Sequence, residues 1–91
     1  MNTIPKTLKT ETMLEQITET FTDEEILTAQ GFDDAVIGID QKTMRLVYSV
    51  SKCLDILSQD MSRWEAREYF DFNVSGSYVG EKTPIWCEDE F

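Results

Sequence analysis

The sequence contains no histidine, and this absence limits the chemistry that the chain can perform. Histidine is the side chain that most often serves as a general base near neutral pH, and it is the commonest ligand for transition metals. Glycine is scarce as well, and the four glycines lie too far apart for a glycine-rich phosphate-binding loop. Base catalysis by histidine and nucleotide binding through such a loop are therefore excluded.

Cysteines and long apolar runs are also few. The two cysteines, Cys53 and Cys87, fit no CxxC or zinc-binding spacing, so we expect two reduced thiols. No stretch approaches the roughly 18 apolar residues that a membrane-spanning helix needs. The first residues also lack the apolar core of a signal peptide. These features predict a soluble protein of the cytoplasm.

Basic residues are outnumbered, because 8 Lys and Arg stand against 18 Asp and Glu and give a formal net charge of -10. Nucleic acids and anionic membranes are bound through clustered Lys and Arg, so we expect neither as a direct partner. A protein partner with a basic surface, such as one that itself binds nucleic acid, suits this charge better.

The residues that are present are sufficient for one small folded domain. Of the 91 residues, 41% are hydrophobic and 11% are aromatic, which is enough for a core. Residues 1–10 mix Thr, Lys, Asn and Pro with isolated apolar residues, and this composition predicts a flexible N-terminal arm. Residues 11–91 are then a single α+β domain, in which a short antiparallel sheet packs against helices.

Helical patterns occur in both halves of the chain. Apolar residues at helical spacing predict a helix over residues 11–21, with a row of glutamates on its outer face. Thr22 and Glu25 have the spacing of a capping box, which predicts a second helix that ends at Gly31. A third helix is expected after Ser51 and ends near Asp60. A fourth is expected between a second capping box, at residues 62 and 65, and residue 76.

The strands are expected between these helices and at the C-terminus. Residues 35–39 and 44–50 predict a β-hairpin with a four-residue loop over residues 40–43. In this register the cross-strand pairs are Ile39 with Met44, Ile37 with Leu46, and Ala35 with Tyr48, all on the core face. Residues 83–87 predict a further strand that lies at an edge or begins at Pro84, because proline cannot donate a hydrogen bond to a sheet.

Carboxylates are the remaining candidates for acid–base or metal chemistry. Adjacent acids occur at residues 33–34 and 88–90, but neither group has the spacing of a calcium-binding loop. Adjacent acids also arise easily by chance in so acidic a chain, so we expect no catalytic residue, no metal and no cofactor. Cys53 lies within an apolar helical face without a histidine base, which predicts a buried thiol rather than a nucleophile.

The last third of the chain contains most of the aromatic residues: Trp64, Tyr69, Phe70, Phe72, Tyr78, Trp86 and Phe91. They either form the core between the fourth helix and the last strand or, where exposed, mark a contact surface.

The same region carries a longer pattern. Residues 68–85 can be written EYFxFNVxGxYVGExTPI. In this pattern and in the preceding hairpin the chain resembles a group of small acidic proteins encoded by bacteriophages. The resemblance implies a phage origin, and hence the cytoplasm of an infected host cell, but no activity or cofactor. Four polar or aromatic residues of the pattern are candidate site residues: Asn73, Tyr78, Glu81 and Thr83.

These observations favour a non-enzymatic phage accessory protein that binds a host or phage macromolecule, or an acidic inhibitor that mimics nucleic acid. The expected partner-binding residues are Glu11, Glu15, Glu19, Asp23, Glu24, Glu25, Trp64, Tyr78 and Trp86. Two alternatives remain open: a small carboxylate-based enzyme that binds a metal or a small molecule, and a structural component that forms a homo-oligomer.

Overall fold

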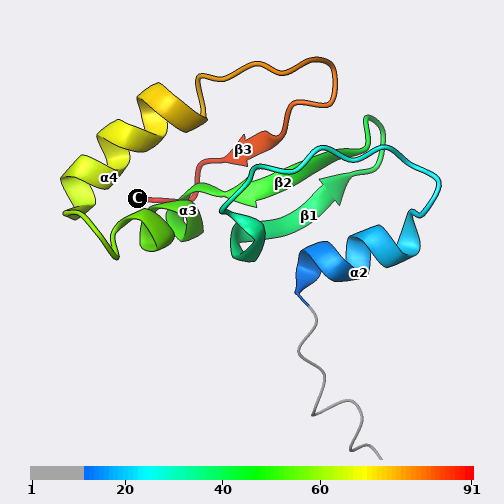
Figure 1. Ribbon diagram of the computed structural model, residues 1–91, viewed down its shortest axis with the longest axis horizontal. Helices are drawn as coiled ribbons and strands as arrows, with labels where there is room; N and C mark the ends of the chain where they lie inside the picture. The colour runs from blue at the N-terminus through cyan, green and yellow to red at the C-terminus, as the bar shows by residue number, and fades with distance from the viewer. Residues whose placement is uncertain (1–11) are drawn as a thin grey trace, which may run out of the picture.

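The computed structural model describes residues 12–91, so the predicted N-terminal arm and Glu11 lie outside the described residues. The elements follow in the order α2 (Met13–Thr20), η1 (Asp33–Ala35), β1 (Val36–Asp40), β2 (Arg45–Ser49), α3 (Val50–Leu57), α4 (Arg63–Tyr69), η2 (Phe70–Val74) and β3 (Ile85–Cys87). Figure 1 shows α2 and α4 at opposite ends of the molecule, with the sheet between them. The predicted α+β fold is confirmed.

The sheet has the order β1-β2-β3 and is mixed. β1 and β2 form the expected antiparallel hairpin, but β3 pairs with β2 in parallel, so the prediction of a wholly antiparallel sheet is wrong. The reason is the connection: α3, α4 and the loop that follows form a crossover long enough to return the chain in the same direction. As expected, β3 lies at an edge and begins directly after Pro84.

Side-chain caps determine where the helices begin. The Glu15 amide donates to the Thr12 hydroxyl (3.2 Å) and the Thr12 amide donates to the Glu15 carboxylate (2.9 Å), which forms a capping box for α2. The predicted capping box of Ser62 and Glu65 is confirmed at the start of α4. α3 begins two residues earlier than expected, because Ser49 and not Ser51 is its cap.

The helix predicted over residues 22–31 is absent, and this segment is irregular and largely extended. Its apolar residues include Ile26 and Ala29, which pack against the core, and the Ala29 amide donates to the Tyr48 hydroxyl (2.7 Å). An extended chain covers more than twice the distance per residue of a helix. The segment therefore runs back along the sheet from α2 to η1, as the cyan trace in Figure 1 shows.

The hairpin is present, but its register differs from the prediction. Val36 pairs with Tyr48 and Ile39 pairs with Leu46, and the ladder is irregular between Val36 and Gly38. Such a bulge accommodates one extra residue, here Ile37, whose side chain is 37% exposed while Leu46 is fully buried. The predicted pairing of Ile37 with Leu46 on the core face is therefore wrong.

The loop has the predicted four residues but is shifted by one, to residues 41–44. Met44 adopts a φ of 57°, and its amide donates to the Asp40 carbonyl oxygen (2.7 Å). The Asp40 carboxylate accepts from the Thr43 hydroxyl (2.9 Å) and the Lys42 amide (3.1 Å), and these bonds lower its pKa. Local polar contacts thus hold the loop in a conformation that is uncommon for a residue other than glycine.

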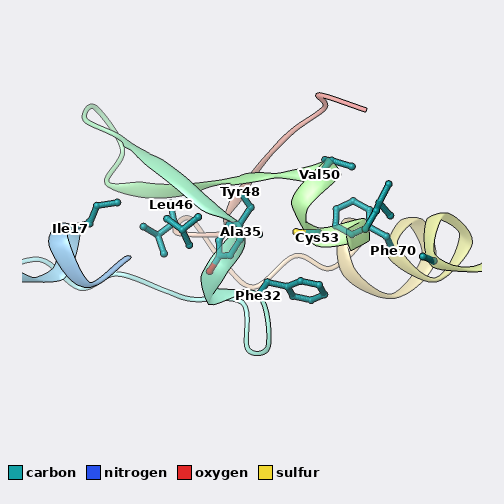
Figure 2. Packing of buried hydrophobic residues seen from close by; sticks show 11 residues of the cluster. Ile17, Phe32, Ala35, Leu46, Tyr48, Val50, Cys53 and Phe70 are labelled. Atoms are coloured by element: carbon teal, nitrogen blue, oxygen red, sulfur yellow. The ribbon is translucent and has the colours of Figure 1, made fainter. Parts of the chain in front are cut away.

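The core lies between the sheet, α3 and the α4–η2 segment. Figure 2 shows Tyr48 near the centre of the cluster, Cys53 and Phe70 toward α3 and α4, and Ile17 on α2 at the other end. Trp86 from β3 packs against Tyr48 (ring centroids 5.0 Å apart) and edge-on against Phe70 (5.3 Å). Three segments that are distant in sequence therefore meet at these rings.

Candidate functional site

The acidic residues near α2 and those near α4 differ in their surroundings. Residues 12–39 contain seven acidic residues and no Lys or Arg. Five of them, which we call the acidic end, lie on α2 and in the turn after it: Glu15, Glu19, Asp23, Glu24 and Glu25. All five residues are exposed, as the sequence prediction of an acidic surface here requires.

Acids of the C-terminal tail, by contrast, are paired with arginines of α4. Arg63 donates two hydrogen bonds to the Glu90 carboxylate (2.8 and 3.0 Å) and a third to Asp55 (2.7 Å). Arg67, one turn later, donates two to Glu88 (2.7 and 3.0 Å). These bonds hold the pKa of Glu88 below, and the pKa of both arginines above, their usual ranges.

Asp89 lies between these two pairs and contacts the start of α3. Its carboxylate accepts from the Ser49 hydroxyl (2.6 Å) and from the Ser51 amide (2.8 Å). Both donors belong to the N-terminus of the helix, where negative charge is favoured, and they lower the pKa of Asp89. We call Arg63, Arg67, Glu88, Asp89 and Glu90 the C-terminal clasp. Its acids have structural partners, which argues against their use as metal ligands or catalytic groups.

The other candidates for chemistry do not form a reactive centre. Burial raises the pKa of the Cys53 thiol to about 12, so it is an inert core residue as predicted. Asp33 and Asp34 lie on η1 and are exposed. Within residues 12–91, no three His, Cys, Asp or Glu side chains gather closely enough to hold a metal ion.

The aromatic residues predicted to contact a partner differ in their exposure. Trp64, on α4, and Tyr78, in the loop after η2, are 69% and 76% exposed, as an interface residue requires. Trp86 is only partly buried and packs against the core, so its contact with a partner stays a prediction. Its indole N–H is buried and has no hydrogen-bond partner in the described part of the chain.

The candidate residues of the EYFxFNVxGxYVGExTPI pattern are not all brought to one place. The Thr83 hydroxyl accepts from the Val79 amide (2.9 Å) and donates to the Gly80 carbonyl oxygen (2.6 Å), which ties the loop together. Gly80 has a φ of 112°, a conformation that glycine adopts readily. Of the four candidates, Asn73 lines the pocket described next, and the other three are not among the residues that line it.

That pocket, of about 500 Å³, is formed by segments from both halves of the chain. Residues 28–32 form one side, and a turn there places Gly31 at a φ of 93° while the Phe32 amide donates to the Ala29 carbonyl oxygen (3.1 Å). The end of α3, the α4–η2 segment, residues 77 and 79 of the following loop, and residues 84 and 86 complete it. Sequence reasoning missed this site because it assigned residues 22–31 to a helix.

No protein-family model, no curated protein and no solved structure matches this chain. Among the helices of residues 12–91, none has the length and apolar character that crossing a bilayer requires.

Proposed function

We propose that this protein is a non-enzymatic binding protein whose acidic end contacts a basic surface on a macromolecular partner. In the setting implied by the sequence pattern, it is a phage accessory protein, and the partner is a host or phage protein. A partner whose basic surface normally binds nucleic acid fits best, because carboxylates would then occupy the positions of phosphates and block that surface.

The observation that carries this proposal is a contrast between the paired acids of the C-terminal clasp and the consecutive exposed acids after α2. Near α4, arginines and helix-terminal donors contact the acids of the C-terminal clasp. In the turn after α2, Asp23, Glu24 and Glu25 are consecutive and exposed, although like charges at this spacing repel one another. The approach of a cationic surface offsets this electrostatic repulsion. The attraction between the two surfaces also raises the rate of association.

Binding to poly-L-lysine, a polycation of simple composition, tests the electrostatic part of this proposal. The variant Glu24→Lys/Glu25→Lys changes two exposed residues of the acidic end. The matched control, Asp60→Lys/Glu68→Lys, changes two exposed acids elsewhere and alters the net charge equally. We expect the first variant to lose affinity by about tenfold or more relative to the control, which corresponds to about 1.4 kcal/mol.

The affinity of the unmodified protein should also fall steeply as salt rises, because exposed charges are screened over about 8 Å at physiological ionic strength. Circular dichroism of both variants establishes that they remain folded. Equal loss in the two variants would mean that only net charge matters, and the acidic end would then not be the binding surface.

A further inference from the structure

The pocket described above differs from the rest of the molecule in its charge. No charged side chain lines it within the described part of the chain, although 29% of all residues are charged. Its apolar wall includes Ile56 and Leu57 from α3, Val74 from η2, and Trp86 from β3. Its volume of about 500 Å³ falls within the range of roughly 300 to 1,000 Å³ that is typical of small-molecule sites.

Polar groups in the pocket are neutral and few. Gln30, in the turn at residues 28–32, and Asn73, on η2, both line the pocket, and both residues are exposed. Within residues 12–91 neither side-chain amide has a hydrogen-bond partner. The Ser77 hydroxyl donates to the Asn73 carbonyl oxygen (3.3 Å), so this backbone group is already engaged. Each free amide offers both donors and an acceptor to a ligand.

We propose that this pocket binds a neutral organic molecule with an apolar body and a hydrogen-bonding edge. An anionic ligand would be repelled by the net charge of -10, and no basic side chain of the pocket would attract it. A cationic ligand would lose its hydration on binding, and no carboxylate of the pocket would compensate for that loss. The apolar wall covers the body of a neutral ligand, and Gln30 and Asn73 bind its polar edge. This site is separate from the acidic end, so it does not depend on the binding of a basic partner.

Two dyes with the same body test the proposal. The probe is N-phenyl-1-naphthylamine, which is neutral, and its control is 8-anilino-1-naphthalenesulfonate, which adds one sulfonate to that body. Binding is followed by dye fluorescence and by quenching of tryptophan emission. A Trp64→Phe background leaves Trp86, a residue of the pocket, as the only tryptophan.

We expect the neutral dye to saturate one site and to quench Trp86, with the sulfonated dye weaker by about tenfold or more. Val79→Asp places a charge in the pocket and should weaken the neutral dye by a similar factor. Phe72→Asp changes a residue next to Asn73 that is 82% exposed and does not line the pocket, and it should leave binding unchanged. Because both positions are exposed, the fold should tolerate either charge.

Three results would overturn the proposal. The neutral dye could fail to saturate, the two dyes could bind equally, or Val79→Asp could bind as well as Phe72→Asp. The comparison of the two dyes uses the unmodified pocket, so it decides the matter even if a variant does not fold.

Discussion

Leu46→Ala and Ile37→Ala form a matched pair, since each change removes the same number of carbon atoms from a residue of the hairpin. Leu46 is fully buried, whereas Ile37 occupies the bulge of β1 and is 37% exposed. Removing a buried leucine side chain costs about 2 to 5 kcal/mol, because the transfer free energy is lost and a cavity remains. The exposed isoleucine should cost at most about 1 kcal/mol, mainly through strand propensity.

The difference is large enough to measure by thermal unfolding. The unfolding entropy expected for 91 residues is about 0.19 kcal/mol/K, so the Leu46 variant should melt about 10 to 25 °C lower. Urea titrations followed by circular dichroism give the two free energies independently. If Ile37→Ala is as damaging as Leu46→Ala, the bulge is misplaced and the register with Ile37 on the core face is correct after all.

Two further predictions concern the caps and the clasp. Thr12→Ala should lower the free energy of unfolding by about 0.5 to 2 kcal/mol, whereas Thr22→Ala should not, because no helix begins there; equal urea midpoints for the two variants would contradict this. The folded-state pKa of Asp89 lies below its ordinary value of 3.8, so its carboxylate stabilises the fold above that pH, and the contribution is lost as the pH falls through the folded-state value. Asp89→Asn should therefore lower the melting temperature at pH 7 and make it less dependent on pH in acid, whereas the exposed Asp34→Asn should do neither.

Sequence patterns predicted the elements that depend on local chemistry. The capping box of Ser62 and Glu65 specifies the start of α4 through neighbouring residues alone, and Pro84 restricts β3 to an edge for the same kind of reason. The α+β class follows from the order of these elements. Burial of Cys53 likewise follows from the apolar face of one helix.

Prediction was wrong where distant parts of the chain compete with local preference. Thr22 and Glu25 have the spacing of a capping box, but the Tyr48 hydroxyl, 19 residues from Ala29, accepts its amide hydrogen in an extended segment. The bulge at Ile37 cannot be predicted from the alternation of apolar and polar residues. One extra residue moves the side chains that follow it to the opposite face of the sheet. The pocket depends on both the extended segment and the crossover, so it could not be derived from the sequence.

The C-terminal clasp explains how an acidic chain keeps a short parallel edge strand in place. β3 has only three residues, and the residues that follow it are acidic, so repulsion from the rest of the chain would favour their release. Arg63 and Arg67, one helical turn apart, bind Glu90 and Glu88, while Asp89 contacts the start of α3. Two of the chain's eight basic residues are used in this way. The uncharged pocket, built by α3, α4, η2 and residues 28–32, shares no lining residue with the acidic end, so a partner bound at the acidic end would leave it open to a neutral ligand.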